Sequence, residues 1–328
     1  MVYFPIYFIW LYYALKSKSF FYFTAANPKI ENGGFLMESK KKIYDQLPKG
    51  TYPETLLFSA KTPFELVKAG IKNSNFTYPI IAKPDIGLRG LAIQKIDSDE
   101  LLRSYISKIQ VDFLIQPFVE FPNEVGIFYV RYPESENGTI SGIVTKEFLI
   151  VIGDGIQTIR ELLEINPRYY MQLPALQEIY GEKLNSIPSR GELINLVPYG
   201  NHARGAKFND ASIWANEKMQ ASINKICLQI PEFYFGRLDI KYNTLEELEN
   251  GKNFSIIELN GAGSEPTHIY DPGHSLFYAW KEIARHQKIL FQISAQNIKA
   301  SVNCLSLSEG ISMLKANSAQ IKKLNAFS

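Results

Sequence analysis

Polar and apolar positions alternate along two segments near residue 240. If "FGRLDIKY" and "IIELN" are strands, their two-residue period directs the apolar side chains to one face and the polar side chains to the other. Pairing of these strands would bring Arg237, Asp239, Glu258 and Asn260 to one patch. Clustered carboxylates raise one another's pKa unless a cation lies between them, so the pattern predicts a counter-ion at this patch.

The rest of the pattern predicts a mixture of strands and helices. Further strands are expected in "YPIIAKP", "LAIQKI", "DFLIQPFV", "EVGIFYVRY" and "GTISGIVTKEFLIVI". A capping box of Asp97 and Glu100 predicts the start of one helix, and longer helical patterns cover residues 212–229 and 273–300. The fold class that follows is α+β.

The residue composition and the hydrophobic pattern of the chain change twice. Residues 1–75 form an aromatic-rich, irregular N-terminal segment, 76–300 read as one interlocked domain, and 301–328 form a polar C-terminal tail. The sequence contains no internal repeat and no low-complexity linker.

Composition narrows the class of protein. The chain has 328 residues, 46% hydrophobic and 21% charged, as in an ordinary globular protein. A net charge of +2 gives no reason to expect nucleic acid or an anionic membrane as the main partner. Cys227 and Cys304 are far apart and have no companion at metal-ligand spacing, so we expect neither a zinc site nor a disulfide framework, and a cytoplasmic protein.

The N-terminal run "MVYFPIYFIWLYYALKSKS" is strongly apolar and aromatic. Its apolar part, Val2–Leu15, is shorter than the roughly 20 residues that span a bilayer. The lysines follow the apolar part, whereas a secretory signal carries its positive charge before it. We expect a buried aromatic helix with no membrane span, and the alternative is a membrane-associating anchor.

Asp239, Glu258 and Asn260 are candidate metal ligands. They offer only hard oxygen donors, which suit Mg²⁺ or Mn²⁺ that is also held by substrate phosphates and water. The Gly-rich turn that follows Asn260 exposes backbone N–H groups, as loops that bind anions do. The alternative is a hairpin whose polar face is simply solvated.

Two lysines are candidates for binding phosphate. Lys83 ends an otherwise apolar strand and precedes the glycine-containing loop Asp85–Gly90. Lys146 stands between large apolar side chains in "GIVTKEFLI", where burial is costly unless an anion is present. The alternatives are a snorkelling lysine at Lys83 and a charged sheet edge at Lys146.

A strand broken by proline lies between the two lysines. In "LIQPFVEFPNE", Pro117 leaves backbone groups available that could bind an adenine edge, and Glu124 follows where a ribose hydroxyl could be bound. The alternative is an ordinary connection between two strands.

Together these motifs resemble the ATP-grasp superfamily, and most closely the carboxylate–amine ligases that include D-alanine–D-alanine ligases. The resemblance covers residues 76–280 and implies two α+β lobes whose antiparallel sheets enclose a nucleotide. It implies ATP and Mg²⁺ as cofactors. By the same resemblance, Lys83 and Lys146 would bind phosphate, Gln116, Phe118 and Val119 would form the adenine hinge, and Glu124 would bind ribose. Asp239, Glu258 and Asn260 would hold the metal, and Arg237 would face the transferred phosphoryl group.

The middle segment resembles a second branch of the family. "VIGDGIQTIRELL" followed by "GNHARGAKFND" is similar to cyanophycin synthetases and bifunctional glutathione synthetases, which implies substrate or phosphate contacts for Asn201 and a catalytic role for Arg204. The chain also departs from the family: "DIGLRG" is poor in Gly and Ser, and residues 1–75 are too few for the substrate domain of dipeptide ligases. D-Alanine is therefore not carried over as the substrate.

The expected function is a Mg²⁺- and ATP-dependent ligase that activates a carboxylate as an acyl phosphate and joins it to an amine. Two alternatives stay open, a small-molecule kinase on the same scaffold and an ATP-binding module without catalysis. The four histidines His202, His268, His274 and His286 are expected to be structural, and only His202 lies near proposed chemistry in the sequence. The two substrates and the oligomeric state are not specified by these motifs.

Overall fold

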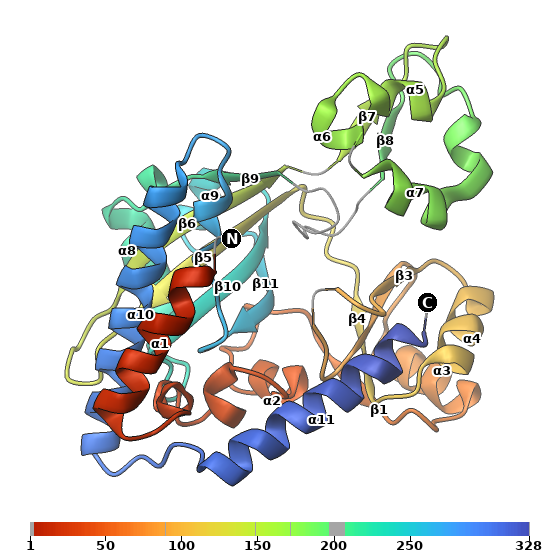
Figure 1. Cartoon of the computed structure of the whole chain (residues 1–328). Helices are drawn as coiled ribbons and strands as arrows, with labels where there is room; N and C mark the ends of the chain where they lie inside the picture. Colours follow the sequence, from red (N-terminus) through yellow and green to blue (C-terminus); the bar gives the residue numbers. More distant parts are fainter. Residues whose placement is uncertain (1–2, 89, 148, 171, 197–206, 328) are drawn as a thin grey trace. The chain divides into compact units, whose positions relative to one another are not determined.

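The structure, a computed structural model, describes residues 3–88, 90–147, 149–170, 172–196 and 207–327. Contacts divide the chain into two compact units, Met1–Val144 with Asp210–Ser328, and Thr145–Asn209. The first unit contains the four-stranded sheet, most of the five-stranded sheet and the long helices (Figure 1). The N-terminal segment and the C-terminal tail set apart in the sequence both belong to this unit.

A four-stranded antiparallel sheet forms the first layer of the first unit. Its strand order is β1-β4-β2-β3, with β1 Leu56–Phe58, β2 Ile80–Pro84, β3 Gln94–Ile96 and β4 Phe113–Pro117. Helices α3 (Phe64–Asn73) and α4 (Asp99–Lys108) bury one face of the sheet. Ile80 and Ala82 point to this core, so the alternation along β2 directs Lys83 to the opposite face.

A five-stranded sheet carries the patch predicted from the sequence. Its order is β11-β10-β5-β6-β9, with β5 Asn123–Val130, β6 Thr139–Glu147, β9 Lys207–Asp210, β10 Phe235–Tyr242 and β11 Phe254–Asn260. Helices α8 (Glu217–Cys227) and α9 (Leu245–Glu249) pack on the face that carries Leu238 and Ile240. The polar side chains of β10 and β11 therefore lie on the other face, as the alternation predicts. The predicted α+β class is confirmed.

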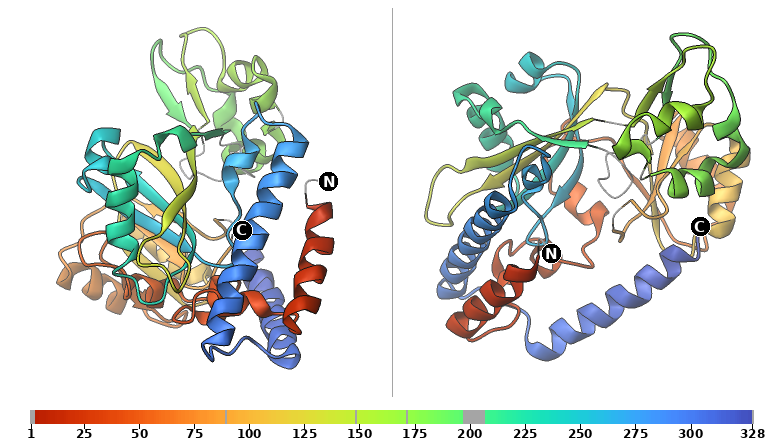
Figure 2. Two further views of the ribbon diagram at one scale, coloured as in Figure 1. Left: turned by 90° about the vertical axis from the view of Figure 1, so that its left-hand side faces the viewer. Right: turned by 45° about the horizontal axis from the view of Figure 1, so that its top comes forward.

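Helices from both ends of the chain belong to the first unit. They are α1 (Phe4–Ser17), α10 (Leu276–Lys299) and α11 (Leu307–Asn325). Both views in Figure 2 show α1 alongside α10, where the Tyr13 and Phe291 rings stack with centroids 4.5 Å apart. Among the described residues, no helix is both long and apolar enough to cross a membrane.

Three details of the sequence prediction need correction. Segment α1 is a helix as expected, but only Ala14 among its described side chains is fully buried, because one whole face is exposed. The polar tail contains the 19-residue helix α11, which Ser306 and Glu309 begin with a capping box. The N-cap of α4 is Ser98, whose side chain accepts the Leu101 N–H, and not Asp97.

The second unit, Thr145–Asn209, is small and has its own core. A two-stranded antiparallel ladder joins β7 (Ile150–Ile152) and β8 (Leu193–Asn195), and its helical segments are α5 Ile159–Glu164, α6 Pro167–Tyr170, α7 Leu173–Tyr180 and η3 Gly181–Asn185. Leu149, Val151, Ile159 and Leu163 pack together in its core. The capping box of Thr158 and Glu161 explains why "QTIRELL" begins a helix.

Candidate functional site

Strands β10 and β11 pair so that the four predicted residues lie opposite each other. Arg237 faces Asn260 and Asp239 faces Glu258 in the antiparallel register. The Arg237 guanidinium binds Asp239 through two parallel bonds, Nε to Oδ1 at 2.9 Å and Nη2 to Oδ2 at 3.0 Å. Asn260 Nδ2 approaches the same Oδ2 at 3.5 Å. The predicted convergence of these four side chains is therefore observed.

Strand β5 leaves room for this cluster by placing a glycine opposite Asp239. The register pairs Gly126 with Asp239, and a Cβ on Gly126 would lie 3.1 Å from Asp239 Oδ1 and 2.9 Å from Val144 Cγ1. A side chain at this position would push the Asp239 carboxylate out of place, since neither neighbour has free space to move into. Gly126 is thus part of the site, although the sequence analysis did not single it out.

Lys83 reaches the same patch from the other sheet. Its Nζ donates to the Tyr44 hydroxyl at 2.8 Å and to the Ile257 carbonyl at 3.2 Å, the residue next to Glu258. Tyr44 in turn donates to the Ile257 carbonyl. Burial lowers the pKa of the Lys83 ammonium to about 7, with the charge of Glu258 opposing this shift and that of Lys40 adding to it.

Lys40, at the start of α2 (Lys40–Tyr44), is a site residue that the sequence analysis missed. Its Nζ lies 3.3 Å from Glu258 Oε1 and donates to the Gly87 carbonyl at 3.0 Å. Burial works to lower the pKa of Lys40, but the carboxylates of Glu258 and Glu38 outweigh it and raise that pKa. Three consecutive lysines in "ESKKKIYDQL" are typical of a solvated helix face, but Lys40 is only 13% exposed.

The two acids beside Lys40 respond to it differently. Burial raises the pKa of Glu258, but Lys40, Lys83 and Arg237 more than offset it and hold that pKa below its usual value. Burial dominates at Glu38, whose pKa is raised and whose Oε2 is buried without a hydrogen-bond partner among the described residues. Of these two acids, Glu258 is therefore the one held by the cationic groups of the site.

The predicted phosphate loop is tied to α2. Asp85 Oδ1 accepts the Lys41 N–H at 2.8 Å and the Asp85 carbonyl accepts the Lys40 N–H at 3.2 Å. The Gly87 carbonyl accepts a hydrogen bond from the Lys40 ammonium. The loop thus begins directly at the cationic part of the site. Arg89 of this loop lies outside the described residues.

The predicted hinge connects β4 to β5. The Gln116 side chain is buried and donates to Thr55 Oγ1 at 2.6 Å, and the Phe118 N–H donates to the Pro79 carbonyl at 3.2 Å. Glu124 is buried at the start of β5, opposite Lys241 of β10. Because the Phe118 N–H is already bonded, any adenine contact at this hinge would use its other backbone groups.

A pocket opens along the hinge. It has a volume of about 520 Å³ and is lined by residues 75–79 and 117–121. Phe118 lies on this wall with two ammonium groups over its ring, Lys95 Nζ at 4.8 Å and Lys241 Nζ at 5.7 Å from the centroid. An aromatic wall of this kind is suited to a flat heterocycle.

Three further predicted residues belong to the second unit by their position in the chain. Lys146 lies on β6 in the second unit, with its Nζ 5.9 Å from the centroid of the Phe208 ring, and its phosphate role stays a prediction. Arg204 and Asn201, expected on the catalytic and substrate side, lie outside the described residues together with His202.

The donor set fits a divalent cation. Asp239, Glu258 and Asn260 present two carboxylates and an amide, which are the hard oxygen ligands that Mg²⁺ takes. In the described structure their charges are met by Arg237 and Lys40 instead. The described residues contain no group of three His, Cys, Asp or Glu side chains that could hold a metal, so the cation would depend on the Asn260 amide and on ligand oxygens.

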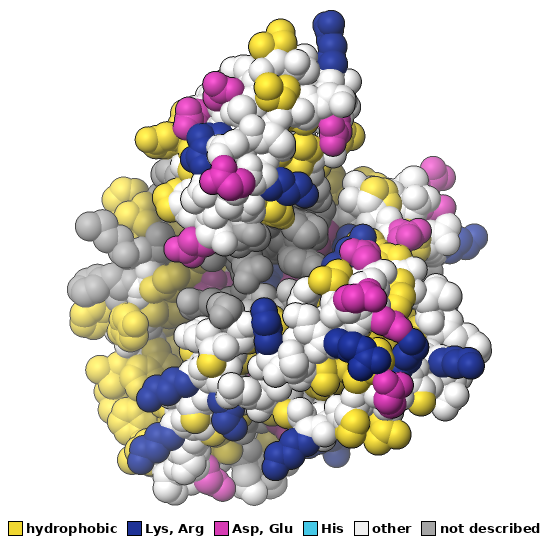
Figure 3. Space-filling view, turned by 90° about the vertical axis from the view of Figure 1, so that its right-hand side faces the viewer, with side chains coloured by type: hydrophobic (Ala, Val, Ile, Leu, Met, Phe, Trp, Pro, Cys, Tyr) yellow, Lys and Arg dark blue, Asp and Glu magenta, His cyan; other side chains and the backbone are white. Residues whose placement is uncertain are grey.

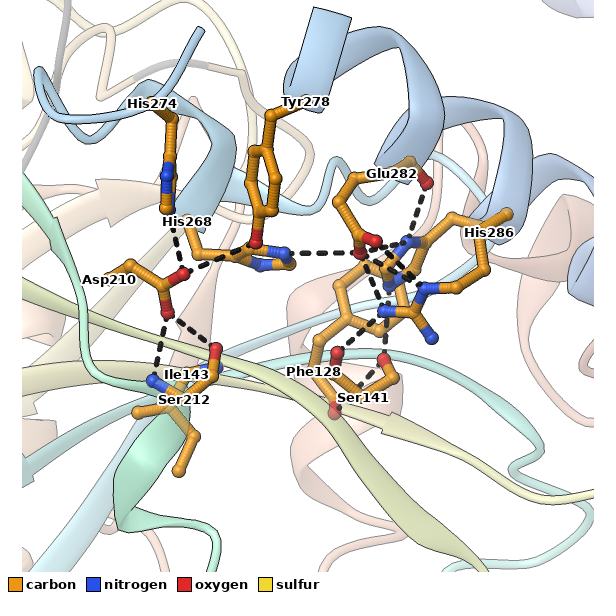
Figure 4. Close-up of polar contacts among 11 residues, drawn as sticks. Phe128, Ser141, Ile143, Asp210, Ser212, His268, His274, Tyr278, Glu282 and His286 are labelled. Carbon is orange, nitrogen blue, oxygen red and sulfur yellow. Dashed lines mark hydrogen bonds and ion pairs between the residues drawn. The ribbon is translucent and has the colours of Figure 1, made fainter.

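The loop after β11 is held by a network that contains the three described histidines (Figure 4). Asp210, at the end of β9, pairs with His274 Nε2 at 2.8 Å, accepts the Tyr278 hydroxyl at 3.3 Å and accepts the Ser212 hydroxyl at 2.5 Å. Burial of Asp210 works to raise its pKa, but these hydrogen bonds outweigh burial and lower the pKa. The loop end at His274 is thereby fastened to the sheet.

Glu282 of α10 is the centre of the second half of the network. It accepts Arg285 Nη2 at 2.7 Å and pairs with His268 Nε2 at 3.3 Å, and these partners outweigh burial and lower its pKa to about 2. His286 pairs with the Ser141 hydroxyl at 3.0 Å, and burial lowers its pKa to about 4. Each of the three described histidines thus has a packing or hydrogen-bonding role, as expected from the sequence.

Comparisons with known proteins give structural neighbours only. No protein-family model and no curated protein sequence matches the chain. Similar solved structures include a bifunctional glutathione synthetase from Pasteurella multocida (17% identity, TM-score 0.39, covering 77% of this chain and 36% of that one) and a D-Ala:D-Ser ligase from Enterococcus faecalis (13%, 0.44, 77% and 61%).

A D-alanine–D-alanine ligase from Bacillus anthracis is also similar, at 12% identity and a TM-score of 0.43, covering 80% of this chain and 68% of that one. These neighbours include the two kinds of ligase that the sequence motifs resemble. The chain spans 36% and 61% of the length of the first two, and at these TM-scores the similarity does not transfer their substrates or residue roles.

Proposed function

We propose that this chain is an ATP-dependent carboxylate–amine ligase of the ATP-grasp type. The proposal rests on one observation. The side chains of Lys40, Lys83 and Arg237 lie buried in one cluster with those of Asp239 and Glu258. These residues come from a helix and from strands of two different sheets. Lys40, Lys83 and Arg237 gather beside the two carboxylates, and cationic groups next to hard oxygen ligands suit a polyphosphate bound together with a divalent cation.

Each side chain has a role in this proposal. Lys40 and Lys83 bind phosphate oxygens, and Asp239, Glu258 and Asn260 hold the Mg²⁺. When bound, Mg²⁺ neutralises the charge on the phosphates and orients them for in-line transfer. Arg237, already fixed by its two bonds to Asp239, faces the transferred phosphoryl group and stabilises charge that develops there. The pocket along the hinge receives the adenine.

The proposed reaction has two steps. A carboxylate oxygen of the first substrate attacks the γ-phosphorus of ATP, the bond to the bridging oxygen breaks, and ADP leaves with the electron pair. An amine then attacks the acyl carbon, loses its proton, and inorganic phosphate leaves from the tetrahedral intermediate. The protein contributes positioning and charge stabilisation to both steps.

The test is turnover with Mg²⁺-ATP against a panel of carboxylates and amines, with ADP and inorganic phosphate measured in parallel. Hydroxylamine added as the amine should trap the acyl phosphate as a hydroxamate. Equal amounts of ADP and phosphate are expected from wild type, and Asp239→Asn and Glu258→Gln should reduce turnover by at least about 10²-fold. ADP without free phosphate would indicate a kinase, and ATP binding without turnover would indicate a non-catalytic module.

A further inference from the structure

The outward face of α1 is apolar from Tyr7 to Leu15. Its exposed large apolar side chains, among the described residues, are Tyr7, Phe8, Leu11, Tyr12 and Leu15, each between 43% and 68% exposed. At 100° per residue these positions fall within an arc of about 140°, so they form one continuous stripe. An apolar stripe of this kind on a protein surface marks a contact with another molecule or with a membrane.

The stripe is not the result of a detached helix. The opposite face of α1 is held by the stacked rings of Tyr13 and Phe291, by the buried Ala14 and by the Trp10 indole N–H, which donates to the Phe20 carbonyl at 3.1 Å. Lys16 also lies over the Phe291 ring, 5.3 Å from its centroid. The helix is therefore anchored on α10 with its second apolar face outward.

The charged residues within the N-terminal segment have one sign. Residues 1–30 contain Lys16, Lys18 and Lys29 and no Asp or Glu, and Lys16 and Lys18 lie exposed at the C-terminal end of the helix. Elsewhere the signs are mixed: on the face shown in Figure 3, basic and acidic side chains are interspersed. An apolar, tyrosine-rich stripe that ends in lysines complements a bilayer surface with anionic headgroups.

We infer that α1 docks on the surface of an anionic lipid bilayer. The 14-residue helix is about 21 Å long, which is too short to span a core of about 30 Å, so it would lie along the surface with its stripe in the interface. A second copy of the chain is less well suited to this face, because a stable protein interface uses about 20–30 residues a side and the stripe has five. The inference is independent of the proposed ligase activity.

The experiment is sedimentation of the full chain with vesicles. Two vesicle types are compared, phosphatidylcholine alone and phosphatidylcholine with about 30% phosphatidylglycerol. We expect at least about tenfold stronger binding to the anionic vesicles, falling with added salt, because each lysine near such a surface contributes about fivefold. A chain carrying Phe8→Trp together with Trp10→Phe, Trp214→Phe and Trp280→Phe has its sole tryptophan in the stripe and should show a blue-shifted emission when bound.

Matched variants distinguish membrane binding through the stripe from non-specific binding through other exposed apolar residues. Phe8→Ser, Leu11→Ser and Leu15→Ser combined should reduce binding at least about tenfold, whereas Leu66→Ser, Ile156→Ser and Ile213→Ser, which remove exposed apolar residues elsewhere, should not. Lys16→Gln with Lys18→Gln should abolish the preference for anionic vesicles, and the exposed pair Lys72→Gln with Lys108→Gln should retain it.

Unchanged unfolding midpoints must accompany these results, so that loss of folding is not mistaken for loss of docking. Two outcomes would overturn the inference. One is wild type that stays in the supernatant with both vesicle types, and the other is a dimer in solution that the stripe variants dissociate.

Discussion

Replacing Arg237 with Gln removes one partner of a nearly buried ion pair. The guanidinium contacts Asp239 at 2.9 and 3.0 Å, and the two side chains are only 16% and 4% exposed. Removing one partner of a buried pair leaves the other charge uncompensated and typically costs about 3–5 kcal/mol. We expect a loss at the lower end, about 3 kcal/mol, because Asn260 still approaches the Asp239 carboxylate.

The same variant should respond to Mg²⁺ more strongly than wild type. With Arg237 removed, Asp239 and Glu258 lack one of their cations, and a divalent ion at the patch would supply the missing charge. At a Mg²⁺ concentration ten times its Kd, binding to the folded state adds about 1.4 kcal/mol. The measurement is urea unfolding of both proteins, followed by circular dichroism, in Mg²⁺ and in EDTA.

Arg103→Gln is the matched control. Its pair with Glu65 is exposed, at 58% and 75%, so its loss should cost about 1 kcal/mol or less and should not respond to Mg²⁺. The reasoning would be refuted if Arg237→Gln were as stable as wild type. It would equally be refuted if Mg²⁺ stabilised all three proteins by the same amount.

Three further predictions concern residues around the patch. Phosphate binds the protonated Lys83 ammonium, so wild-type affinity for Mg²⁺-ATP should fall as the pH rises above about 7, and calorimetry of Lys83→Met should give weaker binding without this dependence. Gly126→Ala places a Cβ 3.1 Å from Asp239 Oδ1 and should lower turnover at least about tenfold in steady-state assays, with the fold retained in circular dichroism. Tyr44→Phe removes the acceptor of the Lys83 hydrogen bond and should destabilise the chain by about 1–3 kcal/mol in urea unfolding; an unchanged midpoint would contradict the contact.

The patch was predictable because it depends on a local rule. The two-residue period assigns Arg237 and Asp239 to the face opposite Leu238 and Ile240 without any knowledge of the fold, and strand pairing then brings β11 alongside. Lys83 was found from another local signal, because it is the charged residue at the end of an otherwise apolar strand.

Lys40 and Tyr44 were missed because their role depends on tertiary contacts. Their i, i+4 spacing does place both on one face of α2, which is a usable signal, but three consecutive lysines look like a solvated surface. Only the approach of the Glu258 strand distinguishes Lys40, with 13% of its side chain exposed, from Lys42 at 67%. The position of a neighbouring strand cannot be read from a local pattern.

The N-terminal helix shows the opposite error. An apolar helix of 14 residues was expected to be buried, because burial is the usual destination of such side chains. The structure buries one face on α10 and leaves Tyr7, Phe8 and Leu15 exposed. The sequence pattern predicts the helix, but it does not predict how many faces of the helix pack against other parts of the chain.

The central claim is that oxygens from β10 and β11 hold a divalent cation against a triphosphate. A crystal structure with Mn²⁺ and a non-hydrolysable ATP analogue, measured for anomalous scattering, tests this claim most directly. The account predicts a Mn²⁺ peak bonded to side-chain oxygens of Asp239, Glu258 and Asn260 at about 2.0–2.2 Å, with Lys40 and Lys83 turned to the phosphates. A nucleotide bound elsewhere, or Mn²⁺ absent from these three residues while the nucleotide is present, would contradict it.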